Sequence, residues 1–293
     1  MSEEDPDARD DPSVGADAAD EPAPGSPEAV ASECETVDVA VGDRVAGVAT
    51  VTLSRPDARN ALDAQLRAEL KDVLDAIEAS DVRVVVLTGS AESGAFVAGA
   101  DVTELRERGP FEQREASERP RVYEYVDDLR QPVVGAINGH ALGGGCELAQ
   151  ACDTRIARED AKLGQPEINL GIMPGGGGTQ RLPRLVGEGQ AMRLILSGEL
   201  IDAEEAHDIG LVDEVHPESE FEERVYDLAG SMADKSPLAL EFAKKSIKAS
   251  SRMDLDDGIE YEAELFAQLF ASEDKNEGID AFFEDREPEW SGK

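Results

Sequence analysis

Two runs of β-branched residues constrain the fold of this chain more than any other feature. They read VRVVVLTG at residues 82–89 and PVVGAI at residues 132–137. A strand that is apolar on both faces is typical of a sheet covered by helices on each side. Apolar residues recur at helical spacing over residues 62–77, and a second helical stretch covers residues 121–129. This order of strands and helices predicts an α/β fold with a parallel sheet.

Three regions of different composition divide the chain. Residues 1–34 are rich in Asp, Glu, Ala, Pro and Gly, which predicts a disordered acidic tail. Residues 35–235 hold the alternating strands and helices, with a short strand expected at residues 211–215. Ser236 and Pro237 fit the cap and the first position of a helix, and apolar residues at helical spacing continue to Phe283. We therefore expect a C-terminal helical region over residues 236–293.

The charge of the chain argues against several classes of function. Asp and Glu total 65 against 28 Lys and Arg, a formal net charge of −37. Such a field repels nucleic acid and anionic membranes, so we expect neither as a partner. We interpret the acidity as a halophilic adaptation, because a dense acidic surface stays hydrated in concentrated salt, which also screens its self-repulsion.

The apolar runs and the cysteines indicate the compartment. No apolar run is long enough to span a bilayer, and the N-terminus is acidic, unlike a secretory signal. The three cysteines, Cys34, Cys146 and Cys152, are odd in number and have no metal-like spacing. We expect a cytoplasmic protein without a metal site or a disulfide framework.

The segment NGHALGGGCELAQACD, residues 138–153, places three glycines directly before a helical run. The first turn of a helix has unpaired backbone N–H groups and a partial positive charge, which stabilise a ligand oxygen that becomes negative. Glycine leaves such an N–H open to approach, and we expect Gly144 to provide it. Glu147 follows one turn later, on the same side of the helix. A backbone donor beside a carboxylate is suited to proton transfer next to a carbonyl.

Two further segments complete the candidate site. The small-residue loop SGAFVAGAD, residues 93–101, is a candidate for a second N–H donor and ends at Asp101, a plausible helix cap. The segment GQPEINLGIMPGGGGTQRL, residues 164–182, holds Glu167 between a proline and an apolar run. In a pocket between apolar segments the pKa of Glu167 would rise, and the side chain could serve as an acid at neutral pH.

These segments, together with LSRPDARNAL and the terminal AFFEDREP, resemble the enoyl-CoA hydratase/isomerase family, also called the crotonase superfamily, over about residues 37–290. The resemblance implies a spiral of ββα units with C-terminal helices that build a homotrimer or a homohexamer. It also implies an acyl-CoA thioester as substrate and no metal or redox cofactor.

The resemblance assigns roles to particular residues. The backbone N–H groups of Ala100 and Gly144 would hold the thioester oxygen, and Glu147 and Glu167 would be the two catalytic glutamates. Ala98, Gly99 and Asp101 would line the substrate beside Ala100. Asp57 and Asp285 occupy positions where relatives often carry lysine. Nearby arginines, Arg55, Arg59 and Arg286, are the candidates for contact with the CoA phosphates.

The implied activity is that of a hydro-lyase, an enoyl-CoA hydratase that adds water to trans-2-enoyl-CoA to give 3-hydroxyacyl-CoA in fatty-acid metabolism. The reverse dehydration of a 3-hydroxyacyl-CoA and Δ3-Δ2-enoyl-CoA isomerisation are the alternatives, and two glutamates favour hydration. Which glutamate is the acid stays open, because a shared water couples their titrations. An RNA-binding relative would be a different class, which the net charge of −37 disfavours.

Overall fold

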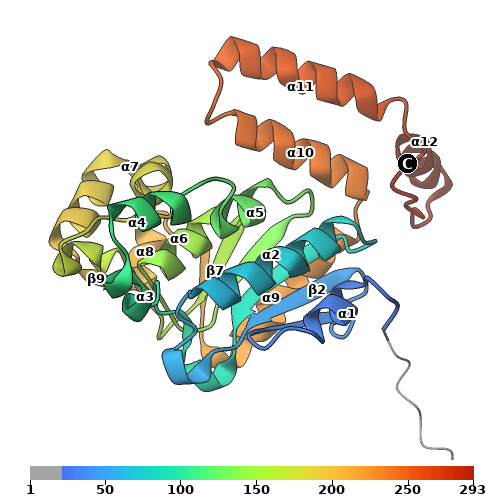
Figure 1. Ribbon diagram of the computed structural model, residues 1–293. Helices are drawn as coiled ribbons and strands as arrows, with labels where there is room; N and C mark the ends of the chain where they lie inside the picture. Colours follow the sequence, from blue (N-terminus) through green and yellow to red (C-terminus); the bar gives the residue numbers. More distant parts are fainter. Residues whose placement is uncertain (1–21) are drawn as a thin grey trace, which may run out of the picture.

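The computed structural model describes residues 22–293, which form an α/β body and a C-terminal group of helices (Figure 1). The helices are α1 (Pro27–Ala31), α2 (Ala64–Glu78), α3 (Val102–Glu107), α4 (Pro110–Ala116), α5 (Val122–Asp128), α6 (Gly144–Ala151), α7 (Gly178–Ser197), α8 (Ala203–Asp208), α9 (Glu218–Ala233), α10 (Pro237–Ala249), α11 (Leu255–Leu269) and α12 (Glu273–Glu284). Three short 3-10 turns are η1 (Pro56–Ala58), η2 (Ala91–Ser93) and η3 (Pro166–Leu170).

The larger sheet has six strands in the order β1-β2-β3-β5-β7-β10. These strands are β1 (Val37–Val41), β2 (Val48–Leu53), β3 (Val84–Gly89), β5 (Val133–Ile137), β7 (Thr154–Arg158) and β10 (Glu214–His216). Strands β1 and β2 form an antiparallel hairpin, and every other neighbouring pair is parallel. Both β-branched runs of the sequence are therefore central parallel strands, as predicted.

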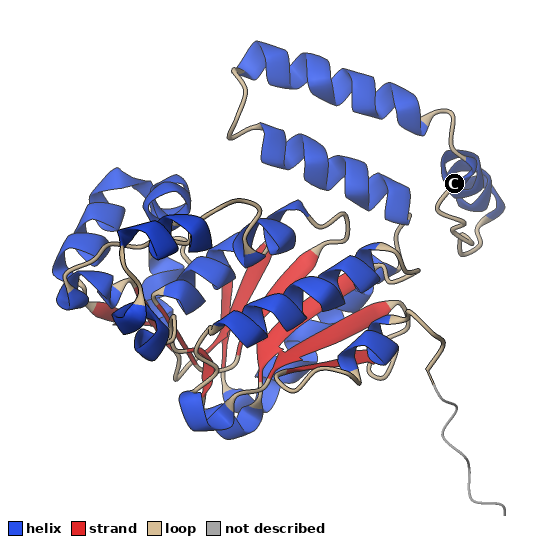
Figure 2. Ribbon diagram, viewed as in Figure 1, coloured by secondary structure: helices blue, strands red, loops and turns tan. Residues whose placement is uncertain are grey.

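The central strand β3 is buried on both faces by different helices. Val85 and Leu87 pack in the apolar cluster that includes α2 and α5, whereas Val84 and Val86 pack with α9 on the opposite face. Because side chains alternate across a strand, a run of consecutive apolar residues supplies both clusters at once. Figure 2 shows the sheet between these two layers of helices.

A smaller sheet lies beside the larger one and positions the glycine-rich segments. Its order is β4-β6-β8-β9, from β4 (Ala95–Val97), β6 (His140–Leu142), β8 (Lys162–Gly164) and β9 (Leu200–Asp202). The first three strands are parallel and β9 is antiparallel to β8. Helix α6 begins directly after β6, and η3 directly follows β8, so the two glutamate-bearing segments leave neighbouring strands at the same edge.

The expected N-terminal tail is partly ordered. Residues 1–21 lie outside the described residues, but residues 27–31 form helix α1, capped by the Ser26 hydroxyl, which accepts a hydrogen bond from Ala29 N at 3.2 Å. This helix packs on β1 and α2, and Ala31 is buried. The prediction of disorder through residue 34 is therefore wrong for this part. Composition does not reveal one turn of helix that tertiary contacts stabilise.

The strand expected at residues 211–215 begins later and is displaced. Leu211 and Val212 donate backbone hydrogen bonds to Ala206 O at 2.7 and 3.2 Å, which closes the end of α8, and both side chains are buried in the core. Only residues 214–216 pair with β7. The backbone N–H groups of Leu211 and Val212 thus complete the hydrogen bonding at the C-terminal end of α8 instead of extending the sheet.

Helices α10 and α11 run alongside each other and stand away from the body, and α12 lies at their far end (Figure 1). Large apolar side chains remain exposed on α11 and α12, including Leu255, Phe282 and Phe283 at 78%, 81% and 80%. Across residues 22–293, none of the helices combines the length and the apolar character needed to cross a membrane.

Candidate active site

The three glycines at the start of α6 meet three different physical requirements. Gly143 has a φ of +51°, a conformation that side chains rarely adopt. A Cβ on Gly145 would overlap the backbone of Val97, so α6 packs directly against β4. A Cβ on Gly144 would lie 3.3 Å from Ala100 N, at the entrance to the first turn of the helix. Glycine is thus needed for the turn, for close packing and for access to the helix N-terminus.

The backbone N–H groups of Ala100 and Gly144 lie close together and have no acceptor among the described residues. Leu62 pairs with the loop in parallel fashion: Leu62 N donates to Gly99 O at 2.8 Å and Asp101 N donates to Leu62 O at 3.0 Å. In such pairing the intervening residue turns its own N–H and C=O to the opposite side. The Ala100 amide is therefore free to act with the helix N-terminus as an oxyanion hole.

Glu147 lies in the first turn of α6 and is 3% exposed. Its Oε1 accepts hydrogen bonds from Gly176 N at 2.7 Å and Gly178 N at 2.8 Å. Its Oε2 has no hydrogen-bond partner in the described part of the chain. The carboxylate is thus held in one orientation by one oxygen, and the other oxygen is available for a substrate or a water.

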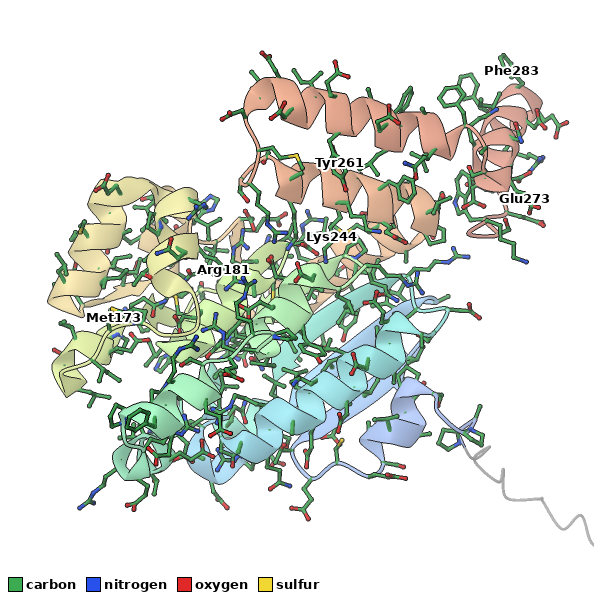
Figure 3. All side chains as sticks on the ribbon, turned by 45° about the horizontal axis from the view of Figure 1, so that its top comes forward. Met173, Arg181, Lys244, Tyr261, Glu273 and Phe283 are labelled. Carbon is green, nitrogen blue, oxygen red and sulfur yellow. The ribbon has the colours of Figure 1, made fainter. Side chains whose placement is uncertain are left out.

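Two arginines hold the glycine segment that carries these donors. Arg121, which precedes α5, donates to Gly175 O, and Arg181 on α7 donates to Gly176 O at 3.1 Å. Figure 3 shows Arg181 beside α6 and α5. The Gly175 carbonyl belongs to the same peptide as the Gly176 N–H, so the Arg121 contact helps to keep that donor directed at Glu147, and the Arg181 contact holds the next carbonyl of the segment.

Glu167 reaches the site from η3 and is half-buried. A Cβ on Gly143 would lie 3.1 Å from its Oε1, so the carboxylate lies over the turn that opens α6. In the orientation that satisfies its partners, the Gln165 amide donates to Glu167 Oε1 at 3.0 Å and accepts from Gln150 Nε2 at 2.9 Å. The structure therefore brings Glu147, Glu167 and both backbone donors together around the glycine triplet.

Burial perturbs both glutamates. Desolvation raises the pKa of Glu147 above its usual value, although the two backbone N–H bonds and the nearby arginines oppose this effect. Desolvation, with a smaller contribution from the charge of Glu147, raises the pKa of Glu167 to about 7. Glu167, which lacks the two backbone N–H bonds of Glu147, therefore has a carboxyl that can hold a proton near neutral pH.

The other loop candidates have structural partners. Ala98 N donates to Arg59 O at 3.1 Å, and Gly99 has a φ of +115°. The Asp101 carboxylate caps α3 through Thr103 N at 3.0 Å and pairs with Arg55 at 3.2 Å, so it is not free for a ligand. Arg59 is exposed and has no ion pair among the described residues.

Arg286 is not brought to this site. It follows α12, where its guanidinium pairs with Glu277 and Glu284 at 2.5 and 2.7 Å. Figures 1 and 3 both place α12 at the end of the C-terminal region that is distant from α6. The expectation that Arg286 joins the substrate site is therefore not met within this chain.

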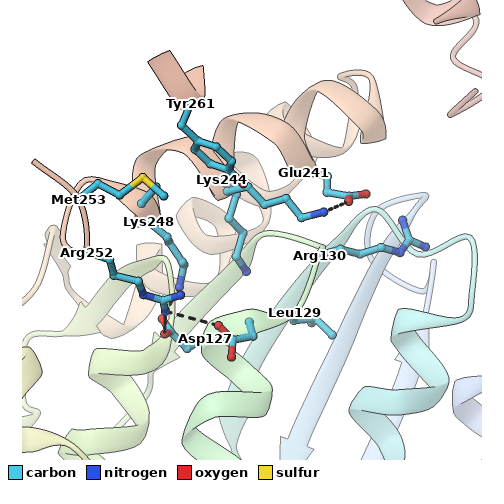
Figure 4. Close-up of a pocket in the computed structure, with 12 residues that line it drawn as sticks. Asp127, Leu129, Arg130, Glu241, Lys244, Lys248, Arg252, Met253 and Tyr261 are labelled. Carbon is cyan, nitrogen blue, oxygen red and sulfur yellow. Dashed lines mark hydrogen bonds and ion pairs between the residues drawn. The ribbon is translucent and has the colours of Figure 1, made fainter. Parts of the chain in front are cut away.

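A cavity of about 230 Å³ lies elsewhere, between α5 and helices α10 and α11 (Figure 4). Three of its cations form ion pairs: Lys244 lies 2.7 Å from Asp153, Lys248 lies 2.5 Å from Asp127, and Arg252 lies 3.4 Å from Asp127. This network anchors α10 to the body, and its charges are neutralised locally. We assign this network a structural role.

Sequence reasoning missed the groups that orient Glu147. The donors Gly176 and Gly178 come from the run of four glycines at residues 175–178, to which the sequence pattern assigned no role at Glu147. Tyr123 also lies at the site: its hydroxyl would be 3.0 Å from a Cβ on Gly144. In the sequence it is one aromatic residue in an ordinary helical pattern, and nothing local distinguishes it.

Comparisons with known proteins agree with this geometry. The sequence model of the enoyl-CoA hydratase/isomerase family matches residues 43–293. A short-chain-enoyl-CoA hydratase of Clostridium acetobutylicum is 43% identical over 83% of this chain and 93% of its own length. A 2,3-dehydroadipyl-CoA hydratase of Escherichia coli is 43% identical over 84% of this chain and 96% of its own.

Solved structures extend the likeness to the fold. The crystal structure of an enoyl-CoA hydratase from Bacillus anthracis has a TM-score of 0.84 and 40% identity, over 88% of this chain and all of that chain. The mixed sheets and the C-terminal helices described above are those of the crotonase fold. The chain therefore belongs to the enoyl-CoA hydratase/isomerase family.

Proposed function

We propose that this protein is an enoyl-CoA hydratase that adds water to a trans-2-enoyl-CoA and yields a 3-hydroxyacyl-CoA. The observation that carries the proposal is the convergence of two glutamates, one buried and one half-buried, on one pair of unoccupied backbone N–H groups. Hydration needs both a group that takes a proton from water and a group that gives one to carbon. Both steps are proton transfers, so the proposal includes no metal or redox cofactor.

The oxyanion hole lowers the barrier for addition. When water oxygen bonds to C3, the electrons of the C2–C3 double bond move toward the thioester oxygen. The Ala100 and Gly144 amides meet this charge at the positive end of α6. Removal of one such donor costs on the order of 3 kcal/mol of transition-state stabilisation.

We propose a division of the acid and base roles from the hydrogen bonds and burial of the two carboxyls. Glu147 accepts two backbone hydrogen bonds, which favour its charged form, so it takes the proton from water. Glu167, with its pKa raised to about 7, holds a proton and delivers it to C2. Since the two charges interact, the pair titrates as one unit.

The names of the relatives support a short acyl chain. Those at 41–43% identity include a short-chain-enoyl-CoA hydratase and a crotonyl-CoA hydratase. We propose crotonyl-CoA as a good substrate, and dehydration of the matching 3-hydroxyacyl-CoA is the same reaction in reverse.

A coupled assay across trans-2-enoyl-CoA substrates of different chain length tests the proposal. Formation of 3-hydroxyacyl-CoA is measured in molar KCl with the wild-type chain, and a 3-enoyl-CoA is included to detect isomerisation. Hydration at a rate typical of enzymes supports the proposal. A purified, folded protein that hydrates none of the substrates, or only isomerises, contradicts it.

We also infer that the chain assembles into a homotrimer or homohexamer. The support is the exposed apolar side chains of α11 and α12, because large apolar patches on soluble proteins usually mark interfaces. Phe283 in Figure 3 is one of them. Light scattering in molar KCl measures the molar mass of the assembly, and the mass of a monomer would refute the inference.

A further inference from the structure

Tyr123 is a buried tyrosine that the reaction outlined above does not use. It lies near the start of α5 and is 8% exposed. A Cβ on Gly176 would overlap its ring and lie 2.6 Å from Glu147 Oε2, whereas its hydroxyl approaches Gly144. The ring is therefore inserted between the two glycine-rich segments, with its polar end directed toward the site.

The hydroxyl of Tyr123 has no hydrogen-bond partner among residues 22–293. A buried tyrosine hydroxyl usually has one. The nearest carboxylate, Glu147, instead accepts the backbone N–H groups of Gly176 and Gly178. The hydroxyl is thus a donor without a protein acceptor at the end of a buried ring, and it faces the space where a substrate would lie.

The position of the hydroxyl coincides with the oxyanion hole. A single point above the Gly144 Cα lies 3.0 Å from the Tyr123 hydroxyl and 3.3 Å from Ala100 N. Leu62 Cδ1 lies 3.5 Å from the same point and forms an apolar wall. A side-chain donor, a backbone donor and the helix N-terminus therefore converge on the entrance to α6.

The charges around Tyr123 keep its proton in place. Burial and the negative charges of Glu147 and Glu167 raise its pKa, and the opposing charges of Arg67 and Arg121 do not reverse this. The Arg121 guanidinium lies 5.7 Å from the ring centroid and supports the ring. The hydroxyl is therefore a neutral donor at every pH at which the glutamates can work.

We propose that the Tyr123 hydroxyl donates a third hydrogen bond to the thioester oxygen, beside the amides of Ala100 and Gly144. No bond to the tyrosine forms or breaks: the proton stays on the phenol and stabilises the negative charge that develops as water adds. This inference rests on the proposed hydration of enoyl-CoA thioesters. A phenylalanine at this position would fill the same space without the donor.

The test compares Tyr123→Phe with the wild type, and with Tyr125→Phe as a matched control on the same helix. Tyr125 is half-buried, and its ring stacks with Lys71 instead of facing the glycines. For crotonyl-CoA we expect Tyr123→Phe to lower kcat by on the order of 10² with little change in KM, the cost of one oxyanion donor. Tyr125→Phe should remain within about twofold of the wild type, and melting curves confirm that both variants fold.

A spectroscopic measurement separates carbonyl contact from water placement. An aryl-conjugated enoyl-CoA absorbs at longer wavelength when hydrogen bonds polarise its carbonyl, so it reports the donors directly on binding. We expect a smaller red shift with Tyr123→Phe than with the wild type or Tyr125→Phe. A full red shift in Tyr123→Phe overturns the proposal even where kcat falls, because the hydroxyl would then act on water.

The outcomes also distinguish this inference from the proposed function. A wild-type protein that hydrates no enoyl-CoA refutes the proposed function, whatever the spectra report. A wild-type protein that hydrates crotonyl-CoA, with Tyr123→Phe equal to it in kcat and in red shift, refutes only the role of Tyr123.

Discussion

Replacing Glu167 by glutamine should make the protein more stable and nearly inactive. The pKa of this carboxyl is raised to about 7, mainly by burial, so folding disfavours its charged form. For a carboxyl with a raised pKa, stability is fully present below the unfolded-state pKa, near 4.3, and is lost as pH rises through the folded-state value. Glutamine keeps the shape of the side chain. Because it does not ionise, its burial does not lower stability as the pH rises.

The magnitude follows from the pKa difference. Each pKa unit corresponds to about 1.36 kcal/mol, so a fully shielded group with this shift would cost about 3–4 kcal/mol. Glu167 is only half-buried and the Gln165 amide faces it, so solvent and this donor reduce the cost. We expect Glu167→Gln to be more stable than the wild type by about 1–2 kcal/mol at pH 8, with kcat lower by on the order of 10²–10⁴.

Urea unfolding from about pH 5 to about pH 8, at fixed protein concentration in molar KCl, measures this difference. Glu159→Gln is the control, because it removes one charge at an exposed position without an ion pair in the described part of the chain. The advantage of Glu167→Gln should grow with pH and level off above about 7. If both variants follow the same pH profile, the buried carboxyl does not carry the effect and the argument from its pKa is wrong.

Three other changes test other parts of the structure. Glu147→Gln should lower kcat for crotonyl-CoA by on the order of 10²–10⁴, and near-normal turnover would remove Glu147 from the mechanism. The Lys244 side chain is 9% exposed and pairs with Asp153. Lys244→Met should lower the free energy of unfolding by about 3 kcal/mol, which is the low end for a buried ion pair because Lys248 still contacts Asp153 at 3.0 Å. An unchanged urea midpoint would contradict this. Molar KCl should raise the melting temperature and favour assembly. The Debye length falls from about 30 Å at 0.01 M to about 3 Å at 1 M, so salt screens the repulsion among the 65 acidic residues. An oligomer size and a melting temperature that do not depend on salt would refute the halophilic interpretation.

Local patterns in the sequence determined the central strands and several helix ends. The β-branched run of β3 alternates between the two apolar clusters, so its burial on both faces could be predicted from composition. Asp101 caps α3 and Asp202 caps α8 through its bond from Glu205 N, because these caps depend on residues only two or three positions away.

Patterns of this kind also indicated part of the geometry of the candidate site. Gly144 and Glu147 belong to one helix turn, and the helix N-terminus follows from the glycine triplet itself. Predictions from local sequence were wrong where tertiary contacts override the preference of a segment. The first turn after Pro27 is ordered by packing on α2, and Leu211 closes α8 instead of entering a strand.

The tertiary structure alone decided which distant groups meet at the site. Gly176 and Gly178 donate to Glu147 across about thirty residues of chain, and the Tyr123 hydroxyl reaches Gly144 from a separate helix. The same folding leaves Arg286 at the far end of α12, bound to acids of its own helix. A local pattern records the propensity of a segment and the face it buries, whereas a hydrogen bond between segments depends on how the sheet and its helices pack.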